Sequence, residues 1–94
     1  RLYALGARDF LVANMPDLGR TPAFNRSETA DDLSAFSAAF NTVLDQQIEG
    51  RRALPGIALV EADVFGLLNA VVADPARFGF ANWTDACLSQ PVCT

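Results

Sequence analysis

The residues best placed to do chemistry lie in one polar loop, Pro16–Asn25, which reads PDLGRTPAFN. An apolar stretch, Phe10 to Met15, precedes it and is typical of a buried strand that Pro16 ends, because proline cannot donate to a sheet ladder. In an open α/β sheet, ligands bind at loops that follow the carboxyl ends of strands. This loop is therefore the most function-like part of the chain.

Charged side chains near this loop have two interpretations each. Asp17 and Arg20 could contact a substrate, but a mutual surface pair or plain solvation is the commoner use of such residues. Asp63 follows the second expected strand, where a catalytic acid could lie, yet capping of the next helix explains it fully. Asp31 and Asp32 are neighbours on a helix and point to different faces, so they do not form an acid–base pair.

The chain contains no His, which excludes several mechanisms for these residues alone. A Ser–His–Asp triad needs an imidazole to take the proton of the nucleophile, and a Cys–His pair fails for the same reason. No G-x-G-x-x-G loop that could cradle a phosphate is present. The 94 residues therefore hold no self-sufficient catalytic constellation, and we expect neither a cofactor nor a metal site.

Composition favours one folded unit without a polyanionic partner. Hydrophobic residues make up 51% of the chain and charged residues 19%, which is enough apolar material for a core. The net charge is −4 and the seven basic residues are scattered, so nucleic acid and anionic membrane surfaces are poor partners. No apolar run approaches the roughly 20 residues of a membrane helix, and no signal-peptide pattern follows Arg1.

Two short apolar runs predict strands. Arg8–Met15 lacks polar alternation, which indicates a strand buried on both faces, with Leu11 and Val12 contributing most. Ile57 to Val60, extending to Ala62, predicts a second strand. A long helical crossover between them implies parallel pairing and an α/β fold in strand–helix–strand–helix order.

Two helices are expected around the second strand. Ser27 is a suitable N-cap for a long helix that ends at Gly50 as its C′ residue. Its apolar residues recur at three- and four-residue steps and predict one buried stripe: Leu33, Phe36, Phe40, Val43, Leu44 and Ile48. Asp63 caps a second helix, Val64 to Ala73, which Pro75 ends.

The C-terminal part of the chain is rich in aromatic residues and contains both cysteines. Phe78, Phe80 and Trp83 are suited to cover the end of a sheet. Cys87 and Cys93 cannot build a four-ligand zinc site without other thiols or imidazoles. In a reducing compartment such thiols would usually be inert or metal-linked, whereas a local disulfide, which we favour, implies an oxidising compartment.

The two ends suggest a piece of a larger domain. Arg1 to Leu5 resembles the last turn of a helix that Gly6 ends as a C′ glycine. Pro91 to Thr94 forms a loop with no closing element. We therefore expect residues 1–94 to be a fragment truncated at both ends.

Three segments in order resemble the GDSL-type (SGNH) lipase/esterase family: GARDFLVANMPDLGRTPAFN, AFNTVLDQQI and PGIALVEADVFGLLNAVVADPARFGFANWTDACL. The resemblance is strongest to the bacterial lysophospholipase-like and autotransporter esterase group. It implies a C-terminal-half fragment of a single SGNH hydrolase domain, with a flavodoxin-like parallel sheet and flanking helices. In the family the corresponding loop lies near the rim of the active site, so the resemblance implies a substrate-rim loop, the candidate rim loop, made of Asn14, Met15, Pro16, Asp17, Leu18, Gly19 and Arg20. Where other members have PPLG this chain has PDLG, so Asp17 departs from the family pattern.

The resemblance also implies an activity. The family hydrolyses esters with a serine in a Gly-Asp-Ser motif, an oxyanion hole of backbone N–H, Gly and Asn, and an Asp-x-x-His segment. None of these motifs occurs here, so the resemblance implies catalytic residues outside the 94 residues and no activity from them alone. The implied substrates are lipid or short-chain carboxylic esters, and the implied location is extracellular, periplasmic or outer-membrane associated in a bacterium.

A second class of function stays open, namely a non-catalytic α/β binding module with a disulfide-stapled C-terminal loop. Such a module predicts cooperative unfolding of the 94-residue chain on its own. A fragment with two strands and open sheet edges predicts a marginal or molten species instead.

Overall fold

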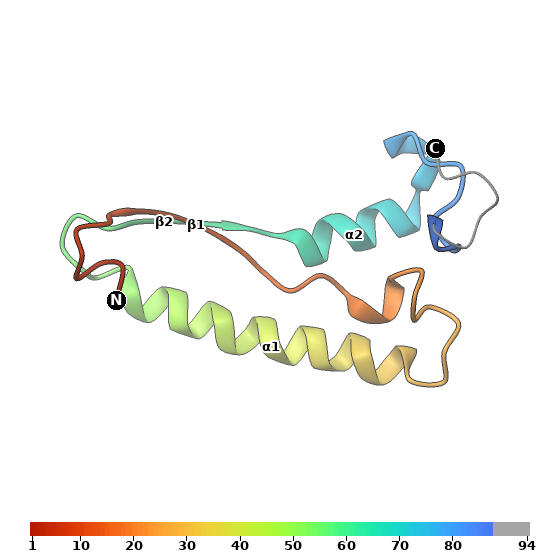
Figure 1. Ribbon diagram of the computed structural model, residues 1–94, viewed down its shortest axis with the longest axis horizontal. Helices are drawn as coiled ribbons and strands as arrows, with labels where there is room; N and C mark the ends of the chain where they lie inside the picture. The colour runs from red at the N-terminus through yellow and green to blue at the C-terminus, as the bar shows by residue number, and fades with distance from the viewer. Residues whose placement is uncertain (88–94) are drawn as a thin grey trace.

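The computed structural model describes residues 1–87. Its elements, in chain order, are β1 (Asp9–Ala13), the 3-10 turn η1 (Leu18–Arg20), α1 (Ala30–Arg51), β2 (Ala58–Ala62), α2 (Val64–Ala73) and the 3-10 turn η2 (Pro75–Phe78). The strands pair in parallel, with Asp9 opposite Ala58 and Ala13 opposite Ala62. The predicted α/β class, element order and parallel pairing are thus confirmed. Figure 1 shows α1 running alongside the sheet, with α2 continuing from the end of β2.

The sheet is buried on one face only. Phe10 and Val12 of β1 are half-buried on the side of α1, whereas Leu11 is 75% exposed and Val60 of β2 is 60% exposed. The prediction that β1 is buried on both faces, with Leu11 as a main contributor, is wrong for the described residues. The reason is that α1 covers one face, and among residues 1–87 nothing covers the other.

α1 begins later and ends later than its sequence signals predict. Ser27 does not cap it, because Ser27 lies in a turn where its hydroxyl oxygen is 3.0 Å from Oγ1 of Thr29. Gly50 does not end the helix, which continues to Arg51. The left-handed backbone needed to reverse the chain falls instead at Gly56, with φ of 73°, in the turn before β2.

The buried face of α1 differs from the predicted apolar stripe. Ile48 is buried, and Leu33 and Leu44 are half-buried, as predicted. The rest of the predicted stripe is exposed: Phe36, Phe40 and Val43. The fully covered positions between Leu33 and Ile48 are polar, namely Ser37 and Asn41, because these share a face with Ile48 at three- and four-residue steps. The helix is thus rotated away from its most apolar side.

α2 agrees with the sequence in both bounds and cap. The carboxylate of Asp63 accepts a 2.9 Å hydrogen bond from the Gly66 N–H, as an N-cap does. Gly6 is confirmed as a C′ glycine: its φ is 106°, its N–H donates to the Tyr3 carbonyl, and the Ala7 N–H donates to the Leu2 carbonyl.

The aromatic segment after α2 does not cover the end of the sheet. Phe78 and Phe80 are 39% and 52% exposed. The segment is fixed instead to the turn before α1, because Asn25 donates to the Thr84 carbonyl at 2.9 Å and Arg26 pairs with Asp85 at 2.9 Å. Cys93 lies outside the described residues, so the Cys87–Cys93 disulfide stays a prediction.

Candidate functional site

The carboxyl ends of the two strands meet through Asn14 and Asp63. The last ladder bond runs from the Asn14 N–H to the Ala62 carbonyl at 3.1 Å. The Asn14 side chain then donates to Oδ1 of Asp63 at 2.9 Å and accepts from the Phe65 N–H at 2.9 Å. One amide therefore joins the end of β1 to the cap of α2 and fixes where the candidate rim loop leaves the sheet.

The electrostatics of Asp63 fit a cap better than a proton donor. The hydrogen bond from Asn14, followed by the one from the Gly66 N–H, lowers the pKa of the Asp63 carboxyl below its ordinary value. Both bonds favour the ionised form, so Asp63 holds α2 as a carboxylate. The interpretation of Asp63 as a cap is confirmed.

Beyond the sheet, the backbone of the loop is bound by polar side chains of α1. The Asn41 side chain accepts from the Met15 N–H at 2.7 Å and donates to the Met15 carbonyl at 2.8 Å. The hydroxyl of Ser37 accepts from the Leu18 N–H at 3.2 Å while donating to the Leu33 carbonyl at 2.9 Å. Because Ser37 is fully buried and Asn41 nearly so, these bonds satisfy groups that water cannot reach.

Asp17 is buried rather than solvated, with 4% of its surface exposed. Its carboxylate accepts from the hydroxyl of Ser34 on α1 and, at 3.1 Å, from the amide of Asn69 on α2. The expected surface pair of Asp17 with Arg20, or plain solvation of Asp17, is therefore wrong. Arg20 is exposed at the end of η1.

Gly19 lies where the loop presses closest to α1. It is buried, and a Cβ added there would collide with the carbonyl of Ala30 and the hydroxyl of Ser34. No larger residue fits at this close approach without a shift of the backbone.

The structure thus divides the candidate rim loop into fixed and exposed parts. It brings Asn14, Met15, Asp17, Leu18 and Gly19 against the two helices, leaves Pro16 half-buried, and leaves Arg20 on the surface. The residues that hold the loop were missed by sequence reasoning: Ser34, Ser37, Asn41 and Asn69. A usable signal existed, because three of them stand at helical spacing on one face of α1.

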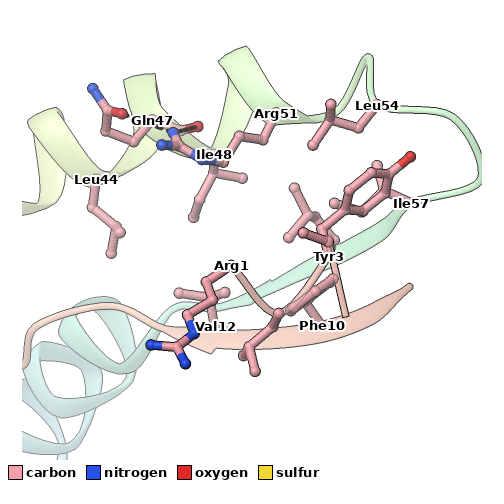
Figure 2. A pocket seen from close by; sticks show the side chains of 13 residues that line it. Arg1, Tyr3, Phe10, Val12, Leu44, Gln47, Ile48, Arg51, Leu54 and Ile57 are labelled. Atoms are coloured by element: carbon pink, nitrogen blue, oxygen red, sulfur yellow. Dashed lines mark hydrogen bonds between the residues drawn. The ribbon is translucent and has the colours of Figure 1, made fainter. Parts of the chain in front are cut away.

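A concave feature lies at the other end of α1, away from the candidate rim loop. A groove of about 630 Å³ separates the second half of α1 from the sheet and the N-terminal turn. Figure 2 shows Leu44 and Ile48 pointing from α1 toward the strands, where Phe10 and Val12 line the other wall. The lining contains no carboxylate, hydroxymethyl group or thiol, and its one hydroxyl, that of Tyr3, donates to the Pro55 carbonyl at 2.7 Å.

Within residues 1–87, no group of three or more His, Cys, Asp or Glu side chains could hold a metal ion. None of the helices in that range has the length and apolar character needed to cross a membrane.

These features define a class: a parallel strand–helix–strand–helix unit whose polar, tightly held loop lies at the carboxyl edge of the sheet. No family model matches the chain. Two GDSL esterase/lipases of Arabidopsis thaliana are 33% and 32% identical to it, over 92% and 95% of the chain and 27% and 26% of their own length. A protein of Pseudomonas putida, described as an uncharacterized protein in the trpE-trpG intergenic region, is 34% identical over 94% of the chain and 15% of its own length.

The similarity to GDSL esterase/lipases runs along nearly the whole chain and supports the GDSL family. The chain spans about a quarter of the length of these curated relatives.

Proposed function

We propose that residues 1–94 are the C-terminal-half segment of a single SGNH domain in a longer GDSL-type serine ester hydrolase, the parent protein. The observation that carries this proposal is the match at 29–33% identity to GDSL esterase/lipases over more than nine-tenths of the chain. The parallel pairing of β1 and β2 supports it, because a flavodoxin-like sheet is parallel and would continue beyond both strands.

In this proposal the segment contributes part of the sheet and a loop beside the substrate, and the catalytic residues lie elsewhere in the parent protein. Without a His, these residues have no group to activate a serine, so the Gly-Asp-Ser and Asp-x-x-His motifs would lie outside them. The candidate rim loop would border the substrate at the carboxyl edge of the sheet. Substrates would be lipid or short-chain carboxylic esters.

We place the parent protein in the bacterial lysophospholipase-like and autotransporter esterase group, outside the cytoplasm. The bacterial relative from Pseudomonas putida supports a bacterial origin. The predicted Cys87–Cys93 disulfide fits an extracellular, periplasmic or outer-membrane location, since such bonds persist in oxidising compartments.

The test is to compare the parent protein with the isolated 94-residue chain on nitrophenyl esters of short and long acyl chains. We expect turnover by the parent protein and none by the 94 residues. Turnover by the 94 residues alone, or none by the parent protein on any ester, would contradict the proposal.

Urea unfolding of the isolated chain addresses the alternative of a free-standing binding module. A single cooperative transition of the 94 residues would favour the module. We expect a broad, weakly cooperative transition, because both sheet edges and one sheet face are open within residues 1–87.

A further inference from the structure

The chain that leaves β1 passes from the sheet to the helix without losing its hydrogen bonds. At Asn14 the backbone N–H still pairs with β2, through the Ala62 carbonyl. At the next residue, Met15, both the N–H and the carbonyl pair with the side chain of Asn41. A side-chain amide has the same donor and acceptor as a peptide unit. Asn41 therefore gives the Met15 backbone the two hydrogen bonds that a neighbouring strand would otherwise supply.

The rest of the loop follows the same face of α1. Ser34, Ser37 and Asn41 follow one another at steps of three and four positions, so their side chains lie on one face of the helix. Ser34 contacts Asp17, and Ser37 contacts Leu18. Asn41 contacts Met15. Side chains of α1 therefore hold the loop from Met15 to Leu18, where its own 3-10 turn η1 begins.

Within this set, Asn41 has the largest effect on direction. It binds the loop at the first residue after the sheet ladder, through two short bonds, with only 8% of its surface exposed. Asn41 therefore sets the direction in which the chain leaves the sheet, and the contacts at Asp17 and Leu18 hold the chain that follows.

We infer that Asn41 is a positioning residue, which aims the candidate rim loop across the carboxyl edge of the sheet and so governs substrate binding. This inference rests on the proposed function, because the substrate at that edge belongs to the parent protein. Asn41 itself points into the protein and does no chemistry.

The first experiment measures ester hydrolysis by the parent protein carrying Asn41→Ala, with active sites counted by a fluorophosphonate that labels reactive serines. We expect KM to rise about tenfold with kcat per active site nearly unchanged, since two buried hydrogen bonds are lost at a residue that only positions. The matched control is Gln46→Ala, at an exposed position of the same helix, where we expect the wild-type KM. A merely structural role would lower the number of active sites and leave KM as it was, and that result would overturn the inference.

The second variant, Asn41→Asp, tests whether the donor and acceptor are what matter. A protonated carboxyl has the shape of the amide and can again accept from the Met15 N–H and donate to the Met15 carbonyl, whereas the carboxylate cannot donate. We expect the ratio of variant to wild-type KM to fall toward one as the pH is lowered. A ratio independent of pH would contradict the inference.

Hydrogen exchange separates this inference from the proposed function. In the parent protein, we expect the Met15 N–H to be protected, to lose protection in Asn41→Ala and to keep it in Gln46→Ala. If the parent protein hydrolyses no ester, the proposed function fails. If it hydrolyses esters while Asn41→Ala changes neither KM nor exchange at Met15, the positioning role fails.

Discussion

The two halves of α1 do different work on the same side of the molecule. The first half presents Ser34, Ser37 and Asn41 to the candidate rim loop and binds its backbone. The second half presents Leu44 and Ile48 to the strands across an apolar groove (Figure 2). Hydrogen bonds have direction and apolar contacts have little, so the first half fixes geometry and the second half supplies stability.

This comparison places the candidate site at one end of the sheet and the apolar groove at the other. Concavity alone would have selected the groove as the site. Its lining has no carboxylate, hydroxymethyl group or thiol, and its one hydroxyl, that of Tyr3, donates to the Pro55 carbonyl. The carboxyl edge instead has a loop held by backbone or side-chain contacts at five positions: Asn14, Met15, Asp17, Leu18 and Gly19. The chemistry of the lining therefore outweighs its size in assigning the site.

The largest effect is expected at the apolar half of α1. Ile48 is the buried hydrophobic residue of the described core, at 5% exposure. Ile48→Ala should lower the free energy of unfolding of the parent protein by about 2–4 kcal/mol, from lost transfer energy and a cavity. Urea unfolding measures this, with Phe40→Ala on the exposed side of the helix as control. Equal losses in the two variants would mean that the buried face of α1 is wrongly assigned.

The next effect is expected where the loop meets the polar half of α1. Gly19→Ala should cost about 1–3 kcal/mol, because the new Cβ meets the Ala30 carbonyl and the loop must move. Gly50→Ala is the matched control, since a Cβ there meets nothing within 4 Å and should stabilise α1 by about 1 kcal/mol. Thermal or urea unfolding shows whether each variant is less stable or more stable than the wild type. A neutral Gly19→Ala would show that the loop does not press against the helix.

The smallest effect is a pH dependence where β2 meets the apolar half of α1. Glu61 of β2 has a pKa above its ordinary 4.5, raised first by its hydrogen bond with Asp45 of α1, then by burial and by the Asp45 charge. The folded state holds this proton more tightly than the unfolded state, so the stabilisation is full below pH 4.5 and is lost as the pH rises through the raised pKa.

Glu61→Gln should therefore flatten the fall in stability as the pH rises above 4.5. Urea midpoints of the variant and the wild type across this range measure the difference. If the slope of stability against pH is the same in the variant and the wild type, Glu61 does not bind its proton more tightly in the folded state, and the prediction is wrong.

Local signals predicted the local features well. The bounds of α2, the Asp63 cap and the C′ role of Gly6 each depend on a few neighbouring residues, and each is confirmed. Parallel pairing also followed, because a long helix between two strands leaves little choice.

Features that depend on distant partners were missed, although the helical spacing of Ser34, Ser37 and Asn41 is visible in the sequence. The Phe36–Phe40–Val43 side of α1 is the most apolar, yet the helix turns Ser37 and Asn41 inward, because the loop needs hydrogen-bond partners there. The exposed Leu11 shows the same limit, since the burial of a strand face depends on which element covers it. Asp17 was expected in solvent because its partners, Ser34 and Asn69, are far away in sequence.

The central claim is that the candidate rim loop, and not the groove, borders the reactive serine of the parent protein. The most direct measurement is a crystal structure of the parent protein with that serine labelled by a fluorophosphonate. The phosphonyl group should lie at the carboxyl edge of β1 and β2, beside Asn14 and the loop to Arg20. A phosphonyl group beside Ile48, at the opposite end of α1, would contradict the account.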